Sequence, residues 1–349
     1  MNLTNLNERL VEWLKGGPES DVVVSSRVRL ARNVEGWPFV NRADDAKRAE
    51  LEAYLRDIML SLDAGPPLHY VELDGLESLL VDLLLERRLI SREHAEADWA
   101  RGVAFDDEER LSVMVNEEDH LRIQYMLGGL RLEEAYRQAD RFDDMLAEGI
   151  PFAYSPRFGY LTACPTNVGT GLRASVMLHL AGLAMSQTMD RAIALAREEG
   201  LALRGGYGEG AHGAGDFYQF SNQSTIGRPE EEIVESVRSA ALRLTQMERE
   251  ARQDLYQSNR DGFRQRIQRA FDMLRSAHTI SSQETLSLLS QLRMALEMDV
   301  FGETPPAVLA DLFLLTLPAH LQTMEGRELD SSVRNELRAV YVRDRLKSR

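Results

Sequence analysis

Two arginines in a short apolar segment are the first residues whose spacing suggests chemistry. In SSRVRL, Arg27 and Arg29 stand two positions apart, so a β-strand would direct both guanidinium groups to one face. Adjacent guanidinium groups repel each other unless an anion lies between them, and phosphate oxygens match the guanidinium fork. A solvent-exposed strand face would fit this segment equally well.

A second segment brings acids and a base together. In NEEDHLRIQ, Arg122 follows Glu117 and Glu118 closely. Taken alone, this grouping is more typical of a surface ion pair, which contributes little energy. The alternative is a charged site in which the arginine binds an anion and a glutamate accepts a proton.

Glycine-rich loops accompany the remaining candidates. Arg173 follows CPTNVGTG, and Arg204 begins RGGYGEGAHGAGDF, which also carries Glu209. Glycine lets a backbone approach a ligand closely, although a lone GxG pattern is a weak signal. Together, five arginines and two glutamates suit the transfer of phosphate from a nucleotide to a positively charged acceptor. Arginines with Mg²⁺ would neutralise the phosphate charge, and the glutamates would hold and deprotonate the acceptor.

Composition excludes several other classes of protein. Among 41 basic residues the only lysines are Lys15, Lys47 and Lys347, so neither a Walker A loop nor a kinase V-A-I-K strand is present. A net charge of −15 argues against nucleic acid as the main partner. Its single cysteine, Cys164, permits no internal disulfide, and no segment resembles a signal peptide or a membrane span, so we expect a cytoplasmic protein without membrane contact.

Periodicity predicts the elements that must position these residues. Strands are expected at VVVSSRVRLARN, GVAFDD, RLSVMVN, HLRIQYML, LALRG and FYQFSN, and LRASVMLHL fits a strand or a helix. Helices are expected over residues 5–15, 43–62, 131–148 and 183–199, and from Pro229 onward. After residue 255 only helices are expected, with breaks near Gly262, Thr279, 302–306, Pro318 and Gly326. The predicted fold class is α+β, with a catalytic domain over residues 1–254 and an all-helical domain over 255–349.

Several blocks in order resemble a known family. SSRVRLARN, NEEDHLRIQ, CPTNVGTGLRASV, RGGYGEG and FYQFSNQSTIG are similar to the signature blocks of the phosphagen (guanidino) kinases, ATP-dependent enzymes that phosphorylate guanidinium nitrogen. Within that superfamily the chain closely resembles the bacterial protein arginine kinases over essentially its whole length. The resemblance implies an antiparallel sheet flanked by helices, with ATP on the sheet and Mg²⁺ held with ATP rather than by direct side-chain ligation.

Residue roles follow from the resemblance. Glu118 would be the catalytic base, Glu209 the second carboxylate on the substrate guanidinium, and Cys164 a substrate-proximal residue that is not a nucleophile. Arg88 stands where the family often has a histidine near the adenine, and it fits either a nucleotide contact or a solvated residue. The implied nucleotide-binding positions are Ser25, Ser26, Arg27, Val28, Arg29, Arg88, Arg122, Arg173, Ala174, Ser175, Val176, Met177, Arg204, Gly205, Gly206, Tyr207, Gly208 and Glu209.

One motif departs from the family. Protein arginine kinases carry a C-terminal R-D-x-x-R-A motif that binds phosphoarginine, whereas this chain reads RNELRA from Arg334 to Ala339. Asn335 therefore replaces a charged acceptor with a neutral one. Arg334 and Arg338 fit either a phosphoarginine site or an ordinary helix surface.

The resemblance implies phosphorylation of arginine side chains in proteins, which marks them in stress response and proteolysis. Implied partners are proteins with exposed arginines, a second copy of the chain, a zinc-binding activator and the Clp protease machinery, without direct nucleic-acid contact. Only about 20 residues precede SSRVRL, where small-guanidino kinases carry a helical domain, so a protein substrate is favoured. The alternatives are a kinase for free L-arginine or another small guanidine, and an inactive phosphoarginine-binding adaptor.

Overall fold

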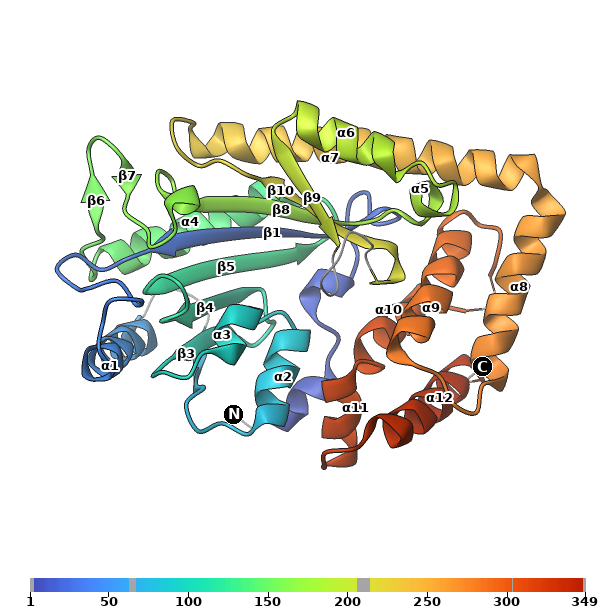
Figure 1. Ribbon diagram of the computed structural model, residues 1–349, viewed down its shortest axis with the longest axis horizontal. Helices are drawn as coiled ribbons and strands as arrows, with labels where there is room; N and C mark the ends of the chain where they lie inside the picture. The colour runs from blue at the N-terminus through green and yellow to red at the C-terminus, as the bar shows by residue number, and fades with distance from the viewer. Residues whose placement is uncertain (1–2, 63–66, 206–213, 303, 348–349) are drawn as a thin grey trace.

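The fold is built on an eight-stranded antiparallel sheet (Figure 1). The computed structural model describes residues 3–62, 67–205, 214–302 and 304–347. The strand order is β2-β3-β4-β5-β1-β8-β10-β9, so β1 lies between β5 and β8. The strands are β1 (Val23–Arg32), β2 (Leu68–Glu72), β3 (Gly102–Asp106), β4 (Leu111–Val115), β5 (Leu121–Gly128), β8 (Leu172–His179), β9 (Leu201–Gly205) and β10 (Phe217–Asn222), with a separate hairpin of β6 (Tyr154–Ser155) and β7 (Gly159–Tyr160).

The central strands carry a different chemistry on each face. Val28 and Leu30 of β1 belong to the main apolar core, whereas Arg27 and Arg29 alternate with them and point to the opposite face. The segment LRASVMLHL is a strand, because β8 pairs with β1 on one side and with β10 on the other. Consequently the arginine face of β1 continues without interruption onto its neighbours.

Two long helices cover the apolar face of the sheet. These are α4 (Leu132–Ala147) and α7 (Glu230–Ser258), whose buried side chains share a core with those of β1 and β8. The other helices before α7 are α1 (Asp45–Ser61), α2 (Ser78–Glu86), α3 (Arg92–Glu96), α5 (Ala181–Met185) and α6 (Met189–Glu198). The opposite, polar face is left for a site.

The C-terminal part is helical, as expected (Figure 1). It contains α8 (Arg260–Ser276), α9 (Ser282–Glu297), α10 (Pro306–Leu315), α11 (Pro318–Glu325) and α12 (Ser331–Lys347). A second apolar core joins these helices to Trp13, Val24, Met177 and Phe217. The α+β fold class is confirmed, while the predicted division at residue 254 falls inside α7 and stays a prediction.

Three predicted elements were wrong in detail. Residues 5–15 form two short 3₁₀ helices, η1 (Leu3–Glu8) and η2 (Glu12–Leu14), because the apolar residues of the two pieces join different cores. The helix expected over 183–199 divides into α5 and α6 around Gln187, which has a left-handed backbone with φ 59°. The break expected near Gly262 falls at Asn259, whose side chain caps the Gly262 amide at 2.9 Å.

Among the described residues, no single helix is long and apolar enough to cross a bilayer. Only α10 and α11 taken together reach the required length and apolar composition, and they are bent by 85° relative to each other.

Candidate active site

A cavity of about 720 Å³ lies on the polar face of the sheet, and all five predicted arginines line it. Arg27 and Arg29 come from β1, Arg122 from β5, Arg173 from β8 and Arg204 from β9. Antiparallel register brings them together, because Arg29 lies directly opposite Arg173 on the neighbouring strand. Segments up to 177 residues apart therefore contribute to one positively charged surface.

Among the described residues, Arg122 is the one member of the arginine cluster that has an ion pair with a carboxylate, that of Glu117. Burial, followed by repulsion from Arg88, Arg122 and Arg173, lowers the pKa of Arg27 to about 9. Burial and the neighbouring arginines likewise hold the pKa of Arg29 well below its ordinary value. The buried Nε atoms of Arg29 and Arg173 have no hydrogen-bond partner among the described residues. Such a site fits a polyanion, because phosphate oxygens would satisfy these donors and relieve the repulsion.

A tight turn between β4 and β5 presents the two adjacent glutamates. Asn116 adopts φ 57°, and its amide donates to the His120 carbonyl at 3.0 Å, which reverses the chain around residues 117–119. The Asp119 carboxylate accepts 2.6 Å hydrogen bonds from Asn33 and from the Ala163 amide. These bonds fasten the turn to the end of β1 and to the loop that carries Cys164.

Glu117 is a structural partner of Arg122. Its carboxylate is paired with Arg122 and accepts a 2.6 Å hydrogen bond from the Ser91 hydroxyl. Burial opposes ionisation of Glu117, but Arg122 and these hydrogen bonds outweigh it and lower the pKa. Glu117 thus fixes Arg122 in the cavity wall.

Glu118 instead faces the cavity with an exposed carboxylate. Partial desolvation, followed by the charges of Asp119 and Glu117, raises its pKa above the ordinary glutamate value. The Arg122 charge and the neighbouring Cys164 side chain act in the opposite direction and lower this pKa, and the Cys164 sulfur lies 2.9 Å from the Thr166 hydroxyl. Glu118 and Cys164 therefore line the same cavity as the arginines, where a proton acceptor can meet a substrate.

Arg88 and Met177 lie together at another part of the polar face. Arg88 Nη2 is 3.8 Å from the Met177 sulfur, and its guanidinium carbon is 5.2 Å from the Trp13 ring centroid. The Arg88 carbonyl accepts a 2.8 Å hydrogen bond from Gln124 of β5. The structure thus places these two predicted nucleotide residues beside each other, outside the residues that line the cavity.

Other predicted positions divide between the two faces. Ser25 is two residues before Arg27 and Ser175 is two residues after Arg173, so both serines lie on the arginine face of the sheet. Gly205 lines the cavity. Ser26 is buried and bonds to the Gly129 carbonyl and the Arg131 amide. The side chains of Val28, Ala174 and Val176 lie in the apolar core, so only their backbones are left to contact a ligand. Gly206, Tyr207, Gly208 and Glu209 lie outside the described residues.

Several cavity residues were missed from the sequence. Gln219 and Ser221 of β10 alternate with core residues, and this period of two in FYQFSN was a usable signal. Glu93 and Trp99 reach the cavity from α3 and the segment after it, where no local pattern marks them. The remaining lining residues not foreseen are Val40, Asn41, Thr166 and Asn167.

The RNELRA segment lies on α12, far along the chain from this cavity. Arg338 is buried rather than part of an exposed helix surface, and it donates to the Thr316 and Ile280 carbonyls and to Asn335 Oδ1 at 2.6 Å. Ala339 is in the second core. Arg334 lines a separate cavity of about 500 Å³ that also carries Asp82, Glu328 and Asp330.

Within the described parts of the chain, no group of three His, Cys, Asp or Glu side chains is arranged to hold a metal ion. The cluster of arginines facing a carboxylate on an antiparallel sheet instead defines a phosphotransferase that neutralises phosphate charge with guanidinium groups.

Comparison with known proteins agrees with this class. The family model "ATP:guanido phosphotransferase, C-terminal catalytic domain" matches residues 50–251, and "Protein-arginine kinase McsB C-terminal domain" matches residues 245–349. The chain belongs to the ATP:guanido phosphotransferase family and, within it, to the protein-arginine kinases.

Similar proteins cover the full chain in sequence and most of it in structure. The protein-arginine kinase of Halothermothrix orenii is 42% identical over 99% of both chains, and that of Bacillus velezensis is 37% identical over 98% of this chain and 94% of its own. A crystal structure of lombricine kinase has a TM-score of 0.58 at 26% identity and covers 72% of this chain and 71% of its own. The substrate-free duplicated taurocyamine kinase from Schistosoma mansoni has a TM-score of 0.56 at 27% identity over 71% of this chain and 34% of its own.

Proposed function

We propose that the protein transfers the γ-phosphoryl group of ATP to the guanidinium of arginine side chains in proteins. The observation that carries this proposal is the cavity itself, in which five arginines without sufficient counterions face the exposed Glu118 carboxylate. The arginines suit the nucleotide phosphates and the carboxylate suits a cationic acceptor. Mg²⁺ bound with ATP would supply further charge neutralisation.

Glu118 is the group that makes the acceptor reactive. A guanidinium has a pKa of about 12, so it stays protonated at neutral pH and is a poor nucleophile. A carboxylate can orient its plane and take one N–H proton as the nitrogen forms its bond to the γ-phosphorus. The bond from that phosphorus to the leaving ADP oxygen then breaks, and the arginines stabilise the charge on the transferring group. Glu209 is proposed as the second carboxylate on the guanidinium.

The neighbourhood of Glu118 supports a substrate presented from outside. Glu118 and Glu93 are both exposed, and both line the same cavity. Glu93 also acts on Arg173 by opposing its loss of charge, so its carboxylate faces into the site. An acidic rim would attract the positive charge of an exposed arginine and its basic neighbours. The names of the full-length relatives agree with this substrate class.

The surroundings of this activity are part of the same proposal. A cytoplasmic location is supported by the single cysteine, Cys164, which suits a reducing compartment. A homodimer, a zinc-binding activator, a connection to Clp proteolysis and a role in stress response are proposed from family membership alone. Of Arg334, Asn335, Arg338 and Ala339, Arg334 lines a cavity among the described residues, and it is the one proposed to contact phosphoarginine.

One assay separates this function from its alternatives. The protein is incubated with γ-labelled ATP, casein and an equal concentration of free arginine, and the products are divided into acid-treated and alkali-treated samples. We expect label on casein that survives alkali and is lost in acid. Label on free arginine alone would indicate a small-guanidine kinase, and no label on either would indicate an inactive adaptor.

A further inference from the structure

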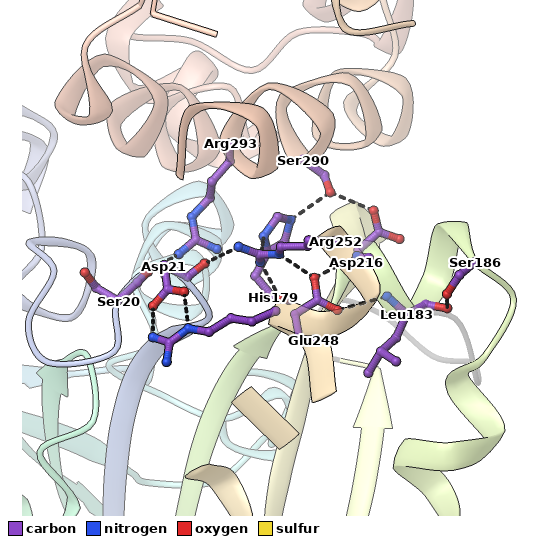
Figure 2. Close-up of polar contacts among 12 residues, drawn as sticks. Ser20, Asp21, His179, Leu183, Ser186, Asp216, Glu248, Arg252, Ser290 and Arg293 are labelled. Atoms are coloured by element: carbon purple, nitrogen blue, oxygen red, sulfur yellow. Dashed lines mark hydrogen bonds and ion pairs between the residues drawn. The ribbon is translucent and has the colours of Figure 1, made fainter. Parts of the chain in front are cut away.

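A second polar cluster lies away from the cavity, where the sheet meets the C-terminal helices (Figure 2). Its centre is Ser290 of α9, whose hydroxyl donates to Asp216 Oδ2 at 2.6 Å. Nε2 of His179, the last residue of β8, lies 2.8 Å from the same hydroxyl. We call His179, Asp216 and Ser290 the junction cluster.

The hydrogen bonds of the junction cluster run in one direction. Ser290 has one proton and gives it to Asp216, so His179 Nε2 must be the donor to the Ser290 oxygen. His179 Nδ1 is then free to accept, and it faces Arg252 Nη2 at 3.4 Å. The order Arg252, His179, Ser290, Asp216 therefore satisfies every polar group in the row with a neutral imidazole.

The Arg252 end of this row is anchored by further hydrogen bonds, and a second arginine links α9 to the start of the chain. Arg252 donates to the His179 carbonyl at 3.1 Å and to Glu248 at 2.7 Å. Glu248 in turn accepts from the amides of Gly182 and Leu183 in α5, the short helix that follows β8. From α9, Arg293 reaches the Ser20 carbonyl at 2.7 Å, and its guanidinium lies 5.9 Å from the Phe217 ring centroid.

Asp216 connects the junction cluster to the active site. It is the residue immediately before β10, and its φ of 59° is a conformation that a non-glycine residue keeps only when its surroundings hold it. Further along β10, Gln219 and Ser221 line the cavity. The Ser221 hydroxyl accepts a 3.2 Å hydrogen bond from Arg173 Nη2, so the placement of β10 decides the placement of an arginine of the cluster.

We propose that Ser290 is a positioning residue for the phosphoryl transfer proposed above: by holding Asp216 it fixes β10, and through Ser221 it fixes Arg173 in the arginine cluster. The expected effect of Ser290 on the reaction rate rests on the proposed function. The structural coupling from α9 to β10 is independent of that function. The Ser290 hydroxyl thereby links the C-terminal helices to catalysis without touching the substrate, in addition to the apolar packing of Phe217 against these helices.

The first test compares Ser290→Ala with Ser287→Ala, a change one turn earlier on the exposed side of α9. We expect kcat of Ser290→Ala to fall about 10-fold, because small misplacements of charge-stabilising groups cost catalysis strongly. The KM for ATP should change by less than about twofold, because four other arginines remain in place. Ser287→Ala should match the wild type. Assays are run well below the melting temperature of each variant, where a role limited to stability would leave kcat unchanged.

A rescue and a cycle complete the catalytic test. Ser290→Thr keeps the hydroxyl and should retain most of the wild-type kcat. Asp216→Gly removes the carboxylate at a φ of 59° that glycine adopts without strain, and it should lose as much kcat as Ser290→Ala. The double variant should lose no more than either single one, because all three break the same contact. The proposal would be overturned if the kcat losses of the two single variants multiplied in the double variant. It would also be overturned if a folded Ser290→Ala had the kcat of Ser287→Ala.

A third measurement does not depend on activity. Hydrogen exchange of the β10 amides, residues 217–222, should be faster in Ser290→Ala than in Ser287→Ala, while exchange in β3 stays the same. Unchanged β10 exchange would refute the coupling. A wild-type protein that phosphorylates no arginine would refute the proposed function instead, so the two failures are distinguishable.

Discussion

Glu117 and Glu118 are neighbours in sequence, yet the fold gives their carboxylates opposite environments. Glu117 is buried in an ion pair with Arg122, which lowers its pKa, whereas partial burial and then the charges of two neighbouring acids raise the pKa of Glu118 in the cavity. A pKa shifted toward neutrality improves a carboxylate as a proton acceptor. The pair therefore divides into a positioning residue and a candidate base.

At this scale we predict the effect of Glu118→Gln. The amide cannot accept the guanidinium proton, so kcat should fall by about 100-fold or more, the usual scale for a general base. The kcat/KM of the wild type should decline as pH falls through a value above the ordinary glutamate range, because protonation removes the acceptor. Steady-state rates across pH provide both measurements.

The matched control is Glu96→Gln, an exposed glutamate on the same α3 that carries Glu93. It should keep the wild-type rate and pH profile. A Glu118→Gln enzyme with near-normal turnover, or with the same acid limb, would exclude Glu118 as the base.

At the scale of elements, the alternating side chains of β1 serve the cavity on one face and the core on the other. Its arginines line the cavity, while at its end Arg32 turns into the core and is paired with Asp143 of α4 at 2.7 Å. The Arg32 guanidinium also lies 3.5 Å from the Tyr160 ring centroid and donates to the Thr170 carbonyl. This buried pair fixes α4 against the strand that presents the site.

We predict that Asp143→Ala destabilises the fold by about 3–5 kcal/mol, because Arg32 is left as an uncompensated buried charge. Chemical denaturation measures the free energy of unfolding directly. Asp144→Ala, an exposed neighbour on the same helix, should change it by less than about 0.5 kcal/mol. Equal effects of the two substitutions would show that the pair contributes nothing to stability.

The strands were predictable because each carries its own signal. Alternation in β1 follows from the apolar core on one of its faces, and the same logic could have identified Gln219 and Ser221 on β10. Pairing across the sheet has no local signal, so the meeting of Arg29 with Arg173 came only from the fold. Trp99 and Glu93 were missed for the same reason.

The first helix shows the opposite limit of sequence reasoning. Residues 5–15 have a helical pattern, but Leu6 packs in one core and Trp13 in another, so tertiary contacts overrode the local preference. The charge of Arg334 and Arg338 was readable in RNELRA, whereas the burial of Arg338 among backbone carbonyls was not.

At the scale of the whole molecule, the two cores are joined through buried polar groups, and these make stability depend on pH. Burial, with repulsion from Arg293 and Arg252, holds the pKa of His179 well below 6.5. The unfolded chain returns it to about 6.5. Because the folded-state pKa is the lower one, the stability that neutral His179 contributes is complete above pH 6.5 and is lost as pH falls.

We therefore predict that His179→Gln weakens the pH dependence of unfolding. Between pH 7.5 and 5.5 the wild type should lose about 1.4 kcal/mol more stability than the variant, since the unfolded histidine gains a proton that the folded one excludes. Urea titrations at the two pH values give this difference, in which contributions of other groups cancel. An identical loss in both proteins would mean that His179 takes up its proton over the same pH range in the folded and unfolded states.

The account depends on one chemical event, the formation of a phosphorus–nitrogen bond on a protein arginine. ³¹P NMR of an arginine-containing protein incubated with ATP, Mg²⁺ and the enzyme at alkaline pH distinguishes this phosphoramidate from phosphate esters. We expect a phosphoramidate signal that grows with the wild type and with Glu96→Gln, and that grows at least about 100-fold more slowly with Glu118→Gln. A signal from phosphate esters alone, or equal rates with all three enzymes, would contradict the account.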